Sequence, residues 1–327
     1  MIKVELKGGA VKEFENGTTP AEIAKSIGAG LYKSVCCAKV DGDLCDLRTP
    51  LEKDCKVELL TFDNVDGQKT FWHTASHVLA QAVKRLYPNA KCAIGPAVDN
   101  GFYYDFDVEK PFSPEDLEKI KAEMKKIVKS GLELERVELS PEEAEKKLEE
   151  MNEPYKVELV KEHSDKGEHI TFYKQGEFID LCAGPHLMSV APIKAIELTA
   201  CTGAYWRGDA NNAQLCRVYG VAFPKASMLE EHLKKLEEAK LRDHNKLGRE
   251  LEYFTTVDYV GQGLPILLPK GARVVQLLQR WVEDVEQSKG CLLTKTPLLA
   301  KRDLYKISGH WDHYLDGMFV LGDPEKD

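Results

Sequence analysis

Residues 71–80 read FWHTASHVLA and place two histidines, His73 and His77, four positions apart at the front of an apolar run. Residues i and i+4 lie on the same face of an α-helix, so both imidazoles are expected to converge on one place. The apolar residues that follow lie on one side of a helix expected over residues 73–87, which ends before Pro88. This stretch therefore predicts a packed helix that carries two imidazoles to the wall of a cleft.

A second motif, DLCAGPH at residues 180–186, supplies Asp180, Cys182 and His186 at the end of a predicted strand. With the first motif it forms an H-x3-H and C-x3-H pair. Three imidazoles and a thiolate suit zinc, which takes nitrogen and sulfur ligands in a tetrahedron. They also suit a metal-free hydrolytic pocket, in which a neutral histidine with a pKa of about 6.5 positions or deprotonates water. Spacing alone does not decide between these two kinds of site, and HTASH by itself is typical of a solvated helix start.

Composition excludes several classes of protein. The chain of 327 residues has 30% charged residues and a mean hydropathy of -0.37, values typical of a soluble protein with two to four domains. We find no apolar stretch of roughly 20 residues and no signal-like N-terminus, so we expect a cytoplasmic protein without a membrane partner. The net charge of -9 argues against a bulk nucleic-acid binder, although local basic faces remain. The nine scattered cysteines contain no Cys-x-x-Cys pair, which argues against a disulfide framework.

The pattern predicts an α+β fold throughout. Residues 1–61 form a small β-grasp unit, with strands at 2–6, 10–14, 35–40 and 55–60 and a helix that begins at Pro20. Thr19 and Glu22 form a capping box for this helix. The unit contains no catalytic constellation, so we interpret it as an adaptor or spacer.

Residues 62–224 are expected to form a second α+β domain. Two further helices begin at Ser113-Pro114 and Ser140-Pro141, each with a capping serine and a proline in the first turn. Strands are predicted at residues 155–160, 169–174, 177–182, 195–199 and 214–220.

Two segments complete the chain. Residues 225–249 are predicted to form one long, charged linker helix. Residues 250–327 contain a helix expected at about 271–289 and a strand after it. These 78 or so residues are too few to close a sheet of their own, so we expect the chain to be truncated within this region.

Several motifs in order along the chain resemble bacterial threonyl-tRNA synthetases. Besides HTASH and DLCAGPH, they are GPAVDNGFYYDFD (95–107), GAYWRGD (203–209), GLPILLPKGA (263–272) and SGHWDHY (308–314). The resemblance extends over nearly the whole chain. Ala183 departs from it, because the family often has a basic residue there, so we do not carry a phosphate contact over to this position.

The resemblance implies a domain for each segment. Residues 1–61 would be a TGS domain, residues 62–224 the editing domain that threonyl and alanyl enzymes share, and residues 250–327 the start of a class II catalytic domain with an antiparallel sheet. The full-length family enzyme is a homodimer that joins threonine to its tRNA, using Zn2+ and Mg-ATP. Those zinc and ATP sites would lie beyond this sequence, so no cofactor and no ligase activity are expected from this fragment.

The resemblance also implies roles for single residues in hydrolysis of serine wrongly attached to threonine tRNA. His73 and Lys156 would orient a water and stabilise charge, while Asp180, His186 and Cys182 would recognise the serine. His77 and Tyr104 would shape and support the pocket. We favour metal-free hydrolysis; in the alternative, His73, His77, Cys182 and His186 hold zinc, as in the related alanyl enzymes. Without the resemblance, Lys156 would be an outward-facing strand residue as readily as a catalytic one.

The acceptor end of threonine tRNA, with its seryl or threonyl ester, is the expected partner. Candidate phosphate contacts are two groups of basic residues, which are equally well explained as solvated helix faces. They are Lys119, Lys121, Lys125, Lys126 and Lys129, and Lys234, Lys235, Lys240, Arg242, Lys246 and Arg249. Two other functions stay open: a freestanding zinc-dependent aminoacyl-tRNA deacylase, and a non-enzymatic RNA-binding module of the TGS type.

Overall fold

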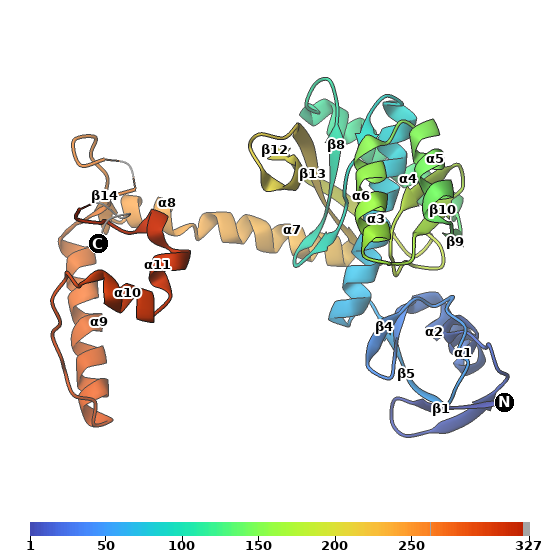
Figure 1. Cartoon of the computed structure of the whole chain (residues 1–327), viewed down its shortest axis with the longest axis horizontal. Helices are drawn as coiled ribbons and strands as arrows, with labels where there is room; N and C mark the ends of the chain where they lie inside the picture. The colour runs from blue at the N-terminus through green and yellow to red at the C-terminus, as the bar shows by residue number, and fades with distance from the viewer. Residues whose placement is uncertain (262, 323–327) are drawn as a thin grey trace. The chain divides into compact units, whose positions relative to one another are not determined.

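The computed structural model describes residues 1–261 and 263–322. The chain divides into two compact units, Met1–Glu238 and a second that begins at Ala239. Both contain helices and strands, so the predicted α+β class is confirmed (Figure 1). Within the described residues, no helix is both long and apolar enough to cross a membrane.

The chain begins with a five-stranded sheet in the order β2-β1-β5-β3-β4. Its strands are β1 (Ile2–Leu6), β2 (Val11–Phe14), β3 (Val35–Val40), β4 (Asp43–Cys45) and β5 (Cys55–Thr61). β1 and β5 pair in parallel, while the other pairs are antiparallel. The predicted capping box of Thr19 and Glu22 starts α1 (Pro20–Ile27), whose apolar face packs on the sheet, and α2 (Ala29–Ser34) follows it.

The long helix α3 (Val65–Leu86) organises the rest of the first unit. It begins eight residues before the predicted start, because Asn64 caps it by accepting the backbone N–H of Asp66. The indole of Trp72 donates to the carbonyl of Ala222 in one sheet, at 2.9 Å. Gln81 donates to the carbonyl of Gln175 in a second sheet, at 3.1 Å. The helix therefore joins two sheets.

The first of these sheets has the order β12-β13-β8-β6, with β7 beside β8; the second has the order β11-β10-β9. The strands are β6 (Lys91–Cys92), β7 (Ala97–Val98), β8 (Gly101–Asp107), β9 (Leu134–Glu138), β10 (Thr171–Gln175), β11 (Phe178–Leu181), β12 (Ala195–Tyr205) and β13 (Gln214–Phe223). Ser113 and Ser140 cap α4 (Pro114–Ser130) and α5 (Pro141–Glu150), as predicted.

Two predictions for this part of the chain are wrong. Residues 155–160 lie in a helix, α6 (Pro154–Asp165), and not in a strand; Lys156 and Val160 are buried at i and i+4, the spacing of a helix face. The predicted linker helix is two helices, α7 (Ala226–Leu241) and α8 (His244–Glu250). Asp243 separates them and caps α8, because its carboxylate accepts the backbone N–H of Lys246 at 2.8 Å.

The second unit contains the predicted helix as α9 (Pro269–Ser288), preceded by the antiparallel pair β14 (Phe254–Thr255) and β15 (Ile266–Leu267). It also contains α10 (Arg302–Ile307) and α11 (His310–His313). The strand predicted after α9 is absent, since residues 291–300 are irregular. No described segment pairs with these residues, and a strand needs a hydrogen-bonded neighbour.

Candidate functional site

A cavity of about 350 Å³ lies within the first unit, lined by α3, α6, β10, β11 and the loop after β11. Five of the seven predicted site residues line it: His73, His77, Lys156, Asp180 and Cys182. The volume is at the lower end of the range of small-molecule sites, roughly 300 to 1,000 Å³. The other two residues, Tyr104 and His186, are fully buried behind its wall.

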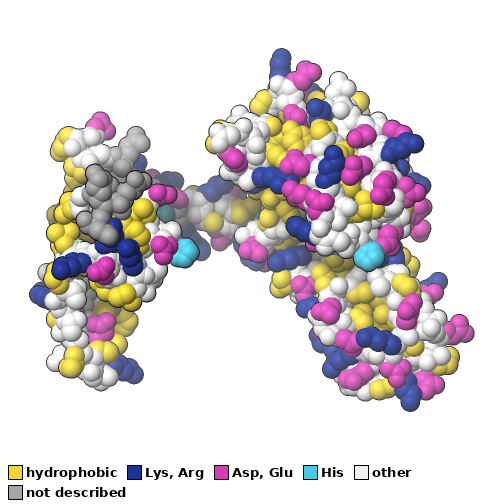
Figure 2. Space-filling model, in the orientation of Figure 1, with side chains coloured by type: hydrophobic (Ala, Val, Ile, Leu, Met, Phe, Trp, Pro, Cys, Tyr) yellow, Lys and Arg dark blue, Asp and Glu magenta, His cyan; other side chains and the backbone are white. Residues whose placement is uncertain are grey.

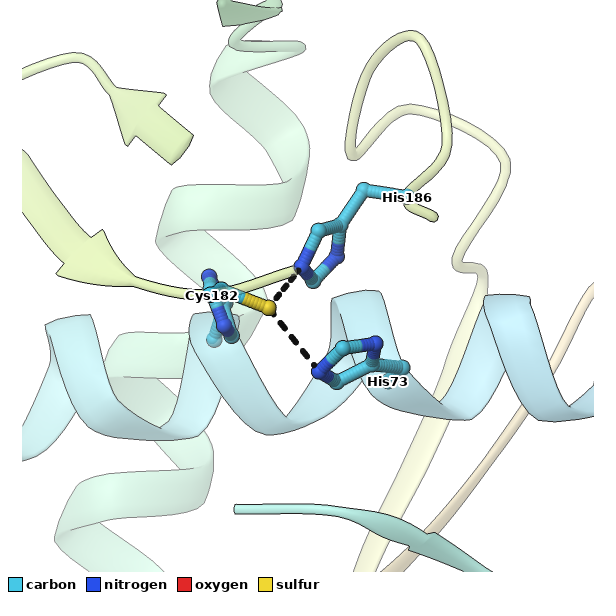
Figure 3. A group of neighbouring side chains, drawn as sticks. His73, Cys182 and His186 are labelled. Carbon is cyan, nitrogen blue, oxygen red and sulfur yellow. Dashed lines mark hydrogen bonds between the residues drawn. The ribbon is translucent and has the colours of Figure 1, made fainter. Parts of the chain in front are cut away.

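The two sequence motifs meet at the sulfur of Cys182 (Figure 3). Its Sγ lies 3.3 Å from Nε2 of His73 and 3.2 Å from Nε2 of His186. The backbone N–H of Gly184 also donates to this sulfur, at 3.3 Å. Gly184 has a φ of +76°, and a Cβ there would lie 2.2 Å from the hydroxyl of Tyr173, so the turn requires glycine.

Thr74, inside the HTASH motif, sets the tautomer of His186. Its hydroxyl donates to the carbonyl of Thr70 and accepts the backbone N–H of Leu187, both at 3.0 Å. The hydroxyl has one proton, so its 3.2 Å contact with Nδ1 of His186 requires Nδ1 to be the protonated nitrogen. Nε2 of a neutral His186 therefore presents its lone pair to Cys182. Sequence analysis missed this residue, although its place between the two histidines was a signal.

Both imidazoles that contact the sulfur are neutral at pH 7. Burial lowers the pKa of His73 to about 4, against the opposing effects of the Pro185 carbonyl and Asp180. Burial, together with the neighbouring His77 and His73, keeps the pKa of His186 well below its usual value. A neutral imidazole can accept a proton, which an imidazolium cannot.

A charged cluster forms the other side of the cavity. Nζ of Lys156 donates to Oδ1 of Asp180 at 2.7 Å, and the hydroxyl of Tyr104 donates to Oδ2 at 2.6 Å. Nε2 of His77 lies 3.6 Å from the same Oδ2. Burial alone would lower the pKa of Lys156 and raise that of Asp180, but their mutual attraction reverses both directions. The pair is therefore ionised, with Lys156 only 4% exposed.

Glu153 fixes the start of α6 and hence the position of Lys156. Its buried carboxylate accepts Nζ of Lys84 at 2.8 Å and the backbone N–H of Cys92 at 2.6 Å. Burial raises the pKa of Glu153, which the two donors oppose. Sequence analysis missed this residue. The signal was Pro154 after it, which marks a helix start just as Pro114 and Pro141 do.

The donor set also fits a zinc ion. One nitrogen each from His73, His77 and His186 and the sulfur of Cys182 all lie within 4.8 Å of one another. Nδ1 of the buried His77 has no hydrogen-bond partner among the described residues, so this nitrogen can accept a metal. Three imidazoles and one thiolate are ligands that zinc accepts in a tetrahedron.

Three of the five basic residues proposed on α4 for tRNA contact are paired with acids. Lys119 and Lys126 pair with acids three residues earlier on α4, and Lys121 pairs with Glu118 and with Glu197. Figure 2 shows Lys and Arg side chains interspersed with Asp and Glu on the face in view. Within the described residues, Lys125 and Lys129 of this group are exposed and form no ion pair. Among the five basic residues of α4, these two are the cations most available to a phosphate.

Two family models match the chain. Residues 2–61 match the TGS domain, and residues 170–219 match the "Threonyl and Alanyl tRNA synthetase second additional domain". The second match contains Asp180, Cys182 and His186.

Curated relatives align with the chain along its whole length. A threonine–tRNA ligase of Clostridium perfringens strain 13 is 61% identical over 327 residues, which are all of this chain and 50% of that protein. The threonine–tRNA ligase of Acetivibrio thermocellus is 51% identical over all of this chain and 51% of its own length. The chain thus spans about half the length of the curated relatives it matches, and over that span it is similar to threonine–tRNA ligases along its whole length.

Proposed function

We propose that the first unit hydrolyses the ester between serine and the acceptor end of mischarged threonine tRNA. The observation that carries this proposal is the meeting of the two motifs at one cavity, where neutral imidazoles and a thiol face an ionised Lys–Asp pair. The match to the second additional domain of threonyl and alanyl tRNA synthetases supports it.

Chemistry gives a reason for such a site in a ligase of threonine. Serine lacks one methyl group of threonine, and a difference of that size in a pocket gives about 1 to 3 kcal/mol of discrimination, or roughly 10- to 200-fold. A second pocket that admits the smaller ester and cleaves it supplies the missing accuracy.

Each side of the cavity has a part in the reaction. His73, neutral at pH 7, accepts a proton from the attacking water through its lone pair and gives it to the ribose oxygen as the acyl C–O bond of the ester breaks. The Lys156 ammonium stabilises the negative charge that develops on the ester carbonyl oxygen. Asp180 receives the serine ammonium, because a carboxylate has about four acceptor positions and Lys156 and Tyr104 occupy two of them. Cys182 contacts the serine hydroxyl, His186 holds the thiol, and His77 orients Asp180.

The complete enzyme would join threonine to its tRNA, as the names of the curated relatives suggest for this chain. The use of ATP and a location in the cytoplasm belong to this proposal. We assign ATP, the family's zinc ion and the dimer contacts to parts of the full-length protein outside this sequence. The acceptor end of threonine tRNA would reach the cavity along α4, past Lys125 and Lys129.

The direct test is hydrolysis of purified threonine tRNA charged with radioactive serine or with threonine. The 327-residue chain should release serine quickly and threonine slowly, and the His73→Ala variant should release serine at least roughly 100-fold more slowly. RNA binding without release of either amino acid would favour a non-enzymatic TGS-type module instead.

A zinc-dependent deacylase is the second candidate, favoured by the four donor atoms within 4.8 Å. Three of the residues His73, His77, Cys182 and His186 would hold the ion and leave its fourth position for a water, and the ion would make this water more acidic or act as a Lewis acid for the carbonyl. Zinc measured in the purified chain before and after chelation separates the candidates. Stoichiometric zinc that is needed for hydrolysis supports the second; full hydrolysis in the chelated protein supports the metal-free site.

A further inference from the structure

The loop after β4 of the β-grasp sheet reaches the segment that contains His186. The carboxylate of Asp46, 8% exposed, accepts the hydroxyl of Tyr173 at 2.9 Å and the backbone N–H of His186 at 3.2 Å. These contacts join residues 127 and 140 positions apart in the chain. A module without chemistry of its own therefore touches the candidate site.

Arg48 completes this connection. Its guanidinium donates to the carbonyls of Leu134, His186 and Leu187, at 3.0, 3.3 and 2.7 Å. It also pairs with Asp46 at 2.9 Å. A buried ion pair offsets its desolvation only when its remaining donors and acceptors are satisfied, and here three carbonyls and two donors satisfy them.

The backbone held in this way has no regular structure of its own. Residues 183–187 belong to neither a helix nor a strand, and no ladder of backbone hydrogen bonds to another described segment fixes them. The N–H and C=O of His186 instead bind Asp46 and Arg48, and its ring contacts Thr74 and Cys182. The ring of Tyr173 packs on that of His186 with centroids 4.4 Å apart. The segment is thus held by α3 from one direction and by the β-grasp loop from another.

We propose that Asp46 and Arg48 of the β-grasp module are positioning residues of the hydrolytic site, which hold His186 and thereby place the thiol of Cys182. This inference rests on the proposed function. It gives residues 1–61 a part in hydrolysis beyond that of an adaptor or spacer. Displacement of a supporting backbone by about 1 Å costs an enzyme up to roughly 100-fold in rate.

The test compares four variants of the 327-residue chain with the wild type. Asp46→Ala removes the acceptor carboxylate and Asp46→Asn weakens it. Tyr173→Phe deletes only the hydroxyl that Asp46 accepts. Asp43→Ala is the matched control, because Asp43 is an exposed acid on β4 of the same module. Single-turnover hydrolysis of seryl-tRNA gives the maximal rate and half-saturation constant of each. Amide hydrogen exchange follows residues 182–190 and the rest of the chain.

Asp46→Ala is expected to lower the maximal rate about 10- to 100-fold while the half-saturation constant changes less than about twofold. Exchange should quicken at residues 182–190 only. Asp46→Asn and Tyr173→Phe should lower the maximal rate by less, and Asp43→Ala should leave it unchanged.

Three results would count against the account in different ways. A wild-type chain that leaves seryl-tRNA intact overturns the proposed function. Wild-type hydrolysis that persists at full rate in Asp46→Ala and Tyr173→Phe overturns only the positioning role. Losses of the maximal rate that are proportional to the fraction of unfolded chain, with amide hydrogen exchange accelerated throughout residues 1–61, also overturn the positioning role. They would show that the contact only stabilises the fold.

Discussion

The two sides of the candidate cavity differ in charge and in burial: Lys156 and Asp180 are buried, while His73 and Cys182 are half-buried. On the histidine–thiol side, His73, Cys182 and His186 contact one another, and burial lowers the pKa of both histidines. On the lysine–aspartate side, burial is outweighed by mutual attraction, so Lys156 and Asp180 both remain ionised. The difference is the presence of a partner of opposite charge within hydrogen-bonding distance.

This contrast assigns different tasks to the two sides. A neutral imidazole accepts a proton from water, whereas a fixed ammonium stabilises a developing oxyanion without reorganising. A substitution that removes the neutral imidazole or the ammonium should therefore slow hydrolysis more than a substitution of an exposed residue at the rim of the cavity.

Removal of the ammonium should have the largest effect. Lys156→Ala leaves the buried Asp180 carboxylate without its counter-charge, so we expect no measurable hydrolysis and a loss of about 3 to 5 kcal/mol in the free energy of unfolding. Lys161→Ala, on the exposed face of the same helix, should change that free energy by less than about 0.5 kcal/mol. Urea unfolding and seryl-tRNA hydrolysis measure both. A Lys156→Ala chain as stable as the control would show that the ion pair contributes nothing.

Removal of the proton acceptor should have the next largest effect. His73→Ala should slow hydrolysis by roughly 10²- to 10⁴-fold, the usual contribution of general base catalysis. His169→Ala is the control, since His169 also lines the cavity but its side chain is 87% exposed. Hydrolysis at single turnover measures both variants. An equal rate in the two would remove His73 from the reaction.

The sequence predicts what depends on local pattern. Ser113, Ser140 and Thr19 cap the helices expected from their neighbours, because a cap involves only residues within one turn. His73 and His77 reach the same cavity for the same reason.

The sequence did not reveal what depends on distant contacts. The run YKVELV was assigned to a strand, although Glu153 and Lys84 hold it as the start of α6. The contacts of Asp46 and Arg48 with His186 join segments about 140 residues apart, and no local pattern records them. Tertiary contacts decided these features.

The stability of the chain should depend on pH through the histidine–thiol side. The pKa of His73 is about 4 in the folded chain, whereas an unfolded histidine has a pKa of about 6.5. Between these values the unfolded chain binds more protons, so the free energy of unfolding is highest above pH 6.5 and falls as the pH is lowered toward 4. The free energy of unfolding is measured by urea unfolding with a chelator present. As the pH is lowered, it should fall less in His73→Asn than in the wild type, and in His169→Asn it should fall as much as in the wild type. An identical fall in all three chains would contradict the assignment.

The smallest effect is expected outside the cavity. Lys125→Ala and Lys129→Ala should weaken tRNA binding by less than about threefold each and reduce its salt dependence, since each removes one exposed cation. Lys119→Ala, whose ammonium already pairs with Asp116 at 3.3 Å, should change binding less. Filter binding at several salt concentrations measures this order. If Lys119→Ala weakened tRNA binding more than Lys125→Ala and Lys129→Ala did, tRNA would not bind along Lys125 and Lys129.

The most direct test of one shared site is a crystal structure of the chain with a non-hydrolysable amide analogue of 3′-seryl adenosine. The account predicts that the seryl group lies in the cavity, with its ammonium within hydrogen-bonding distance of Asp180 and its carbonyl carbon near a water held by His73. An analogue bound elsewhere, or one that contacts only one of the two sides, would contradict it.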